Sequence, residues 1–127
     1  MVEPETATRL RVYVGERDQR QGEPLAHALV RAAQRHGLAG ATVLRGIEGY
    51  GAHSRIHALH PFTLSADLPL LVEIIDRPER VEAFLPEVDR LVSEGLVTLD
   101  RVEVRYYRRR PAGPPARPAG REKPRRA

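Results

Sequence analysis

The sequence predicts an α+β domain in which four strands are combined with two amphipathic helices. Four segments alternate apolar and polar residues or are almost wholly apolar, as strands do. Two other segments repeat apolar residues every three or four positions, as helices do. Pro and Gly stand at the ends of these segments, where they favour turns and helix termini. The chain of 127 residues has the size of a single domain.

The first strand and the first helix are predicted from adjoining patterns. The segment RLRVYVG alternates apolar and polar residues and ends at Gly15. The segment EPLAHALVRAAQRHG follows, and in it Pro24 suits a first helical turn and Gly37 suits a C-cap. A polar stripe runs along one side of this helix. The apolar residues expected to face inward are Leu25, Leu29, Val30 and Ala33.

The second and third strands are expected in ATVLRGIEGY (residues 41–50) and DLPLLVEIID (residues 67–76). Three glycines interrupt the second strand. The third strand is apolar on both faces, with one set made of Leu70, Val72 and Ile74 and the other of Leu71 and Ile75. We therefore expect the sheet face without helices to be buried by an oligomer.

The second helix is expected after the third strand, with Asp76 as its N-cap, Pro86 inside it and Gly95 as its C-cap. The fourth strand is expected in LVTLDRVEVRYY (residues 96–107), where apolar and charged residues alternate. The apolar positions of the second helix fit the helical spacing, and they are Val81, Phe84, Leu85, Val88, Leu91 and Val92.

The resulting order is β-α-β-β-α-β, which is the ferredoxin-like plan. Such a fold has an antiparallel four-stranded sheet with two helices on one face. We expect this domain over residues 9–107. Residues 1–8 are expected to be a disordered lead. Residues 108–127 are expected to be a disordered Arg- and Pro-rich tail, because they hold no side chains able to form a core.

Charge is divided unevenly along the chain. From residue 108 onward there are eight basic residues and one acidic residue, whereas residues 1–107 hold thirteen basic and sixteen acidic residues. The net charge of +4 therefore belongs to the tail and does not indicate a nucleic-acid-binding face on the domain. The tail is interpreted as a solubilising segment. The alternative is attraction to nucleic acid or acidic membrane by charge alone, so no specific nucleic-acid partner is predicted.

Several function classes are excluded or disfavoured by composition. The chain has no Cys, which excludes disulfides, thiolate nucleophiles and Cys-ligated zinc. No apolar run approaches the roughly 18–20 residues that cross a bilayer, and the start lacks the apolar stretch of a signal peptide. A cytoplasmic location is therefore expected. The Ser and Thr residues are scattered outside any nucleophile-elbow pattern, so no enzymatic activity is predicted.

The segment RGIEGYGAHSR (residues 45–55) is the strongest local signal for a ligand site. Its glycines allow close approach of a ligand or positive φ angles, and its Arg, His and Ser side chains can donate to an anion. The alternative is a bent strand that leads into a loop. The spacing is not that of a Rossmann or P-loop motif. The candidate ligand-binding residues are Arg45, Gly46, Gly49, Tyr50, Gly51, His53, Ser54 and Arg55, together with Arg105.

Three histidines offer an alternative site for a metal ion. His53, His57 and His60 are spaced by four and three residues, which would place them on one face of a helix able to hold zinc or copper. Gly51 before them and Pro61 after them disfavour a long helix, and no carboxylate follows until Asp67. Solvated loop histidines are the favoured interpretation, so no metal ligand is assigned.

The sequence resembles a family of small uncharacterised bacterial and archaeal proteins classed as PII-like (domain of unknown function 190). The matching stretches are LRVYVGE, GEPLAHALVRAAQRHGLAGATVLRGIEGYG, LSADLPLLVEIID and LPEVDRLVSEGLVTLDRVEV. The resemblance implies a homotrimer of ferredoxin-like subunits related to the nitrogen-regulatory PII proteins. It further implies adenine nucleotides in clefts between subunits, and a loop at residues 52–66 that docks on an unknown target protein.

The chain departs from true PII proteins at the phosphate loop. Those proteins carry a Gly- and Lys-rich loop between the second helix and the fourth strand. Here that junction is SEGL (residues 93–96), and the only lysine is Lys123 in the tail. Fewer phosphate donors suit AMP or ADP better than ATP. We therefore predict a non-enzymatic PII-like regulator that needs no cofactor. The alternatives are a metal-binding trimer and a constitutive protein-interaction module.

Overall fold

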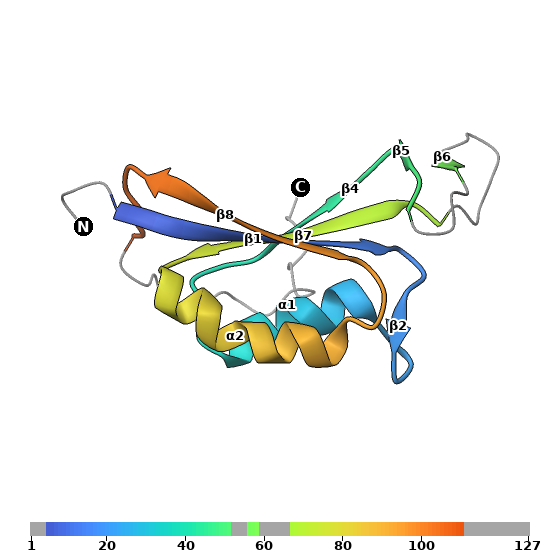
Figure 1. The fold of residues 1–127 in the computed structure, drawn as a ribbon, viewed down its shortest axis with the longest axis horizontal. Helices are drawn as coiled ribbons and strands as arrows, with labels where there is room; N and C mark the ends of the chain where they lie inside the picture. The colour runs from blue at the N-terminus through green and yellow to red at the C-terminus, as the bar shows by residue number, and fades with distance from the viewer. Residues whose placement is uncertain (1–4, 52–55, 59–66, 111–127) are drawn as a thin grey trace, which may run out of the picture.

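The computed structural model describes residues 5–51, 56–58 and 67–110. Within these residues, one antiparallel sheet has the strand order β4-β7-β1-β8, and two helices cover one of its faces (Figure 1). The predicted α+β ferredoxin-like fold is confirmed. The strands of this sheet are β1 (Glu5–Gly15), β4 (Thr42–Arg45), β7 (Pro69–Asp76) and β8 (Leu96–Val104), and the helices are α1 (Leu25–Arg35) and α2 (Pro78–Leu91).

Strand β1 starts earlier than the sequence predicts. It begins at Glu5, inside the segment expected to be a disordered lead, so that expectation is wrong for residues 5–8. The reason is strand pairing, because β8 continues to Val104 and its backbone pairs with β1 as far as Glu5. The predictions of disorder for residues 1–4 and 111–127 lie outside the described residues.

Helix α1 is amphipathic and its end follows the expected use of glycine. Gly37 takes a φ of +75° just beyond His36, which is the C-cap. The amide of Gly37 donates to the carbonyl of Gln34 and the amide of Leu38 donates to that of Ala33, which together form a Schellman motif. Pro24 is the N-cap residue rather than a residue of the first turn.

Helix α2 is capped differently from the prediction. Its N-cap residue is Arg77, because Pro78 occupies the first helical position. The carboxylate of Asp76 accepts hydrogen bonds from the amides of Ala39 at 2.9 Å and Arg77 at 2.7 Å, so it fastens the end of β7 to the α1–β4 connection. The expected N-cap at Asp76 is therefore wrong.

The expected C-cap at Gly95 is also wrong, because the helix ends at Leu91 and Val92 is already extended. Gly95 instead forms the turn into β8 with a φ of +152°. A Cβ on this residue would lie 2.7 Å from the carbonyl oxygen of Tyr13. Glycine is thus required here for two independent reasons, its backbone conformation and its close approach to β1.

The variant Gly95→Ala is expected to lower the free energy of unfolding by about 2–4 kcal/mol, since it adds backbone strain to a steric clash. Urea unfolding followed by circular dichroism measures this loss. The matched control is Gly40→Ala, because a Cβ on Gly40 meets nothing within 4 Å. The control should change stability by no more than about 0.5 kcal/mol. Equal stability of the two variants would contradict the role assigned to Gly95.

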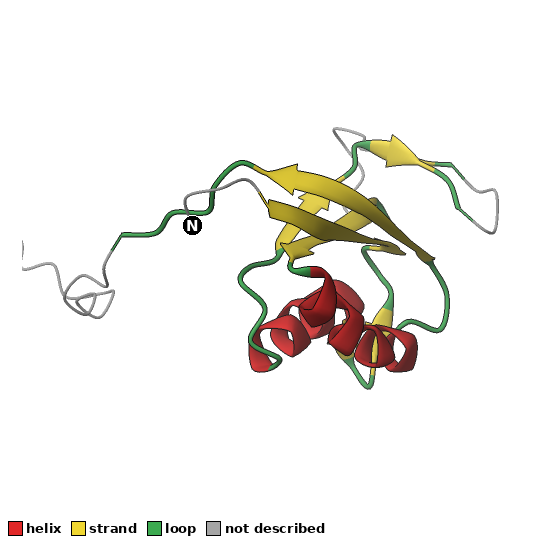
Figure 2. Cartoon of the chain, turned by 60° about the vertical axis from the view of Figure 1, so that its left-hand side comes forward, coloured by secondary structure: helices red, strands yellow, loops and turns green. Residues whose placement is uncertain are grey.

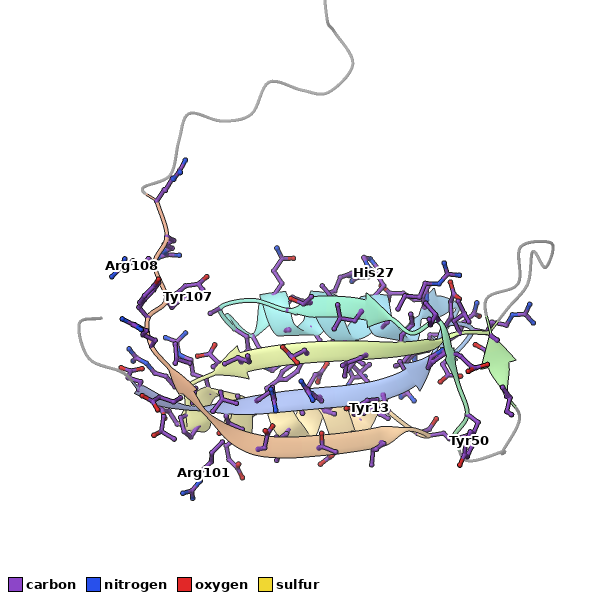
Figure 3. All side chains as sticks on the ribbon, turned by 90° about the horizontal axis from the view of Figure 1, so that it is seen from above. Tyr13, His27, Tyr50, Arg101, Tyr107 and Arg108 are labelled. Atoms are coloured by element: carbon purple, nitrogen blue, oxygen red, sulfur yellow. The ribbon has the colours of Figure 1, made fainter. Side chains whose placement is uncertain are left out.

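The core lies between the two helices and the face of the sheet that they cover (Figure 2). The residues of β1 that point to this face are almost fully buried, as the alternation in β1 predicts, and so are Val72 and Ile74 of β7. The largest fully buried side chains are Phe84, Leu10, Leu29, Leu68, Ile74, Val12, Val72, Val81 and Val88. The other face of the sheet, here called the open face, is not covered by any described element of this chain (Figure 3).

Two short hairpins are additions to the predicted plan. Strands β2 (Gln19–Arg20) and β3 (Glu23–Pro24) are joined by Gln21 and Gly22, whose φ values of 51° and 80° are those of a type I′ turn. Strands β5 (Glu48–Gly49) and β6 (His57–Ala58) form a second pair, which projects beyond the end of the sheet (Figure 1). No helix in the described part of the chain is long and apolar enough to span a membrane.

Candidate functional site

A cleft of about 690 Å³ lies at the end of the sheet where β1 finishes. Its walls come from four segments of the chain: the end of β1 with the following turn, the end of β5 with the glycine segment after it, the start of β7, and the α2–β8 junction. Tyr50 marks this end of the sheet in Figure 3. The lining residues are Tyr13, Val14, Gly15, Asp18, Gly49, Tyr50, Gly51, Asp67, Pro69, Ser93, Glu94, Gly95 and Leu96.

Two carboxylates are fixed in the cleft by backbone hydrogen bonds. Asp18 accepts a hydrogen bond from the amide of Gly15 at 2.8 Å. Asp67 accepts one from the amide of Arg17, also at 2.8 Å. Both carboxylates lie around Gly15, where an added Cβ would be 3.1 Å from Asp67 and 3.3 Å from Asp18. Sequence reasoning interpreted Asp67 as a turn residue before a strand and did not consider Asp18.

The described lining of the cleft is acidic. It contains Asp18, Asp67 and Glu94, and no Arg, Lys or His is among the described lining residues. These carboxylates can accept hydrogen bonds from hydroxyl or amino groups of a ligand. They would repel a phosphate group, so a phosphorylated ligand needs cationic donors from elsewhere.

The glycines predicted to approach a ligand divide into two kinds. A Cβ on Gly46 would lie 2.7 Å from Cγ of Pro69, and one on Gly49 would lie 3.1 Å from the same atom. The amide of Gly46 also donates to the carbonyl of Pro69 at 2.7 Å. Packing on β7 therefore accounts for these two glycines. Gly49 and Gly51 both line the cleft, and of the three glycines only Gly51 has open space around the position of an added Cβ.

The other predicted site residues are dispersed. Tyr50 lines the cleft and is 72% exposed. Arg45 lies outside the described lining and forms an ion pair with Glu16 at 3.0 Å. Arg105 directly follows the end of β8, whereas the cleft lies where β8 begins at Leu96, so Arg105 is at the opposite end of the sheet. Figure 3 labels Arg108 at that end. Within one chain, the structure therefore does not bring Arg105 to the cleft. His53, Ser54 and Arg55 lie outside the described residues.

Of the three histidines that could form a metal site, the structure describes only His57. His57 belongs to β6, where its backbone pairs with Gly49. His53 and His60 lie outside the described residues. Among the residues that the structure does describe, no three His, Asp or Glu side chains are grouped so that they could hold a metal ion.

Comparison with known proteins identifies relatives of the whole domain. The family model DUF190, described as "Uncharacterized ACR, COG1993", matches residues 7–104. A UPF0166 protein of Aquifex aeolicus (strain VF5) is 41% identical over 97 residues, which are 76% of this chain and 91% of that protein. The UPF0166 protein MJ1524 of Methanocaldococcus jannaschii is 32% identical over 91 residues, which are 71% of this chain and 83% of that protein.

Comparison with solved structures shows that PII-like proteins share this fold. CPII of Thiomonas intermedia K12, a nitrogen regulatory PII-like protein, was solved bound to ADP, AMP and bicarbonate. It is similar to this chain with a TM-score of 0.58 and 16% identity, covering 84% of this chain and 94% of CPII. At this identity the similarity shows the fold alone. Together with the family match, it shows that this chain belongs to the DUF190 (UPF0166) family and has the ferredoxin-like fold of PII-like proteins.

Proposed function

We propose that the protein is a non-enzymatic PII-like regulator that binds AMP or ADP in the cleft at the end of its sheet. The observation that carries this proposal is the meeting of Gly51 and the α2–β8 junction in one cleft. In the PII proteins that this chain resembles, the phosphate loop occupies the equivalent junction and the signalling loop follows the second strand, which supports a ligand site here although residues 93–96 carry no lysine. The adenine nucleotides bound by CPII support the same class of ligand.

We further propose that the functional form is a homotrimer in which the open face is buried. One row of apolar side chains crosses all four strands of this face, since Leu44 pairs with Leu71, Leu71 with Tyr13, and Tyr13 with Leu96. Leu44 is 52% exposed, Tyr13 37% and Leu96 57%. A continuous apolar row on the surface favours contact with another protein surface.

The charged residues of the open face are paired with one another. Arg11 and Glu73 are 2.9 Å apart and Arg9 and Asp100 are 2.6 Å apart. The hydrogen bond from Arg9 lowers the pKa of Asp100 below its ordinary value, and the hydrogen bond to Glu73 raises the pKa of Arg11. Burying a paired charge costs less free energy than burying a single charge, so these two ion pairs are compatible with a subunit interface.

In this proposal the acidic lining holds the nucleoside part of the ligand. The carboxylates of Asp18 and Asp67 accept hydrogen bonds from ribose hydroxyl groups. The phosphates are held by cations outside the described lining, from Arg55 of the 52–66 loop or from an adjoining subunit. Ligand binding then biases that loop, which docks on a target protein.

Titration of the full chain with AMP, ADP and ATP tests the proposed ligand. At about 100 times its dissociation constant, AMP or ADP is expected to raise the free energy of unfolding by about 2.7 kcal/mol, measured as a shift of the melting temperature. Gly51→Val places a branched side chain in the cleft and should abolish this shift. Gly40→Val, at a glycine outside the cleft that also has open space around it, is the matched control.

Two results would contradict the proposed function. If no adenine nucleotide stabilises the wild-type protein, the proposal that it binds AMP or ADP is wrong. A Gly51→Val variant that binds AMP and ADP as the wild type does would place the site elsewhere. Stabilisation by Zn²⁺ or Cu²⁺ instead, lost in a variant with His53→Ala and His57→Ala, would favour the metal-binding alternative.

A further inference from the structure

The segment RYYRRR (residues 105–110) follows β8 and combines four arginines with two tyrosines. All six residues are exposed, with Tyr106 at 50% and Tyr107 at 58%. Figure 2 shows the chain leaving the sheet after β8, on the side away from the projecting β5–β6 pair. The candidate cleft lies at the other end of the sheet, so this segment is a separate surface.

The arginines of this segment lack the carboxylate partners that several arginines of the domain have. Arg9, Arg11, Arg31, Arg45 and Arg90 form ion pairs with carboxylates. Among the described residues, Arg80 and Arg101 form none, as in this segment. Among the described residues, no carboxylate forms an ion pair with the four arginines of this segment. Its positive charge is therefore uncompensated within the described chain and available to a polyanion.

The two tyrosines are held in place by this segment and by the body. The guanidinium carbon of Arg108 lies 3.9 Å from the centroid of the Tyr106 ring, which is a cation–π contact. The hydroxyl of Tyr107 donates a hydrogen bond of 3.4 Å to the carbonyl of Ala39, in the connection between α1 and β4. Two aromatic rings are thus presented beside unpaired arginines at one position on the domain.

We propose that residues 105–110 bind single-stranded nucleic acid without sequence preference. The arginines contact backbone phosphates, and bases stack on the exposed rings of Tyr106 and Tyr107. Stacking on aromatic residues beside a cationic track is how proteins hold single strands of any sequence. Residues 105–110 form neither a helix nor a strand, so they offer no element that could enter a groove and hold side chains against base edges.

The composition favours nucleic acid over an anionic membrane surface. A peripheral membrane segment combines basic residues with apolar side chains that enter the acyl region. Residues 105–127 contain no Leu, Ile, Val, Met, Phe or Trp, so the tyrosines are the only large side chains with apolar surface there. Tyrosine rings suit stacking with bases, whereas little apolar area is offered to lipid.

Fluorescence anisotropy of a labelled oligothymidylate, titrated with the full chain over a series of salt concentrations, tests the proposal. The variant with Tyr106→Leu and Tyr107→Leu is expected to bind about tenfold or more weakly, with the salt dependence unchanged. The variant with Tyr106→Phe and Tyr107→Phe should bind as the wild type does, because it keeps both rings. This variant also shows whether loss of the hydrogen bond from the Tyr107 hydroxyl to Ala39 changes the binding affinity.

Charge is tested separately. The variant with Arg108→Gln, Arg109→Gln and Arg110→Gln should bind more weakly, and its logarithmic salt slope should be shallower by about 2, since each phosphate contact on a single strand contributes about 0.7. The control removes the same charge elsewhere, with Arg31→Gln, Arg35→Gln and Arg90→Gln, and should leave the slope unchanged. Melting temperatures of all variants establish that they are folded.

Three results would overturn the proposal. The first is a wild-type chain that fails to bind oligothymidylate at low salt. The second is a leucine variant that binds as tightly as the wild type, which would reduce the interaction to charge alone. The third is binding to phosphatidylserine vesicles in the absence of oligothymidylate binding, which would make the partner a membrane surface.

Discussion

Replacement of Phe84 by alanine is expected to lower the free energy of unfolding by about 3–5 kcal/mol, the range for a buried aromatic side chain. Phe84 is 1% exposed and lies in the core between α2 and the sheet. Its ring also contacts His36 edge-on, with centroids 5.3 Å apart, so it joins the two helices. Domains are stable by only about 5–15 kcal/mol, so this loss is a large part of the total.

Urea unfolding at one fixed protein concentration measures the loss, because association would make stability depend on concentration. Phe84→Leu is the matched control, since it keeps most of the buried volume and should cost less than about 1.5 kcal/mol. Leu85→Ala, at a partly buried position next in the helix, should cost less than Phe84→Ala. Similar costs for Phe84→Ala and Leu85→Ala would contradict the central place of Phe84 in the core.

A double variant with Leu44→Glu and Leu96→Glu is expected to convert the proposed trimer into a folded monomer. Both residues belong to the apolar row of the open face and are about half exposed within one chain. The carboxylates therefore remain solvated in the monomer, whereas in the trimer they would be buried without partners. Light scattering should give about three times 14.2 kDa for the wild type and one times this mass for the variant.

The control for this experiment adds two carboxylates where no interface is proposed. Gln34→Glu and Ala83→Glu change exposed positions of α1 and α2 and should leave the trimer intact. A monomeric wild type would contradict both the interface and a cleft completed by a neighbouring subunit. A double variant that stays trimeric would show that the subunits associate through another surface.

Local patterns in the sequence were sufficient to predict the main elements of the sheet and both helices. The alternation in β1 and the helical spacing around Phe84 report which side of an element is buried, and burial is decided by the side chains of that element. Even the αL residue at Gly37 could be predicted, because a Schellman motif depends only on the last turn of one helix.

Strand ends and caps were harder to predict, because partners distant in the sequence decide them. Glu5 is in a strand because β8 continues opposite to it. The N-cap is Arg77 because Pro78 occupies the first helical position, and the carboxylate of Asp76 instead accepts a hydrogen bond from the distant amide of Ala39. Gly46 resembles a ligand-binding glycine in the sequence, yet its missing side chain makes room for Pro69.

The sequence by itself determined the fold class and the family, since both depend on patterns along one chain. Only the tertiary structure decided which residues form the cleft. It brings Asp18, Asp67 and Gly51 together from three separate loops and leaves Arg105 at the far end of the sheet. The physical reason is that a cleft is formed by chain segments meeting at a sheet end, and this meeting depends on strand order and register.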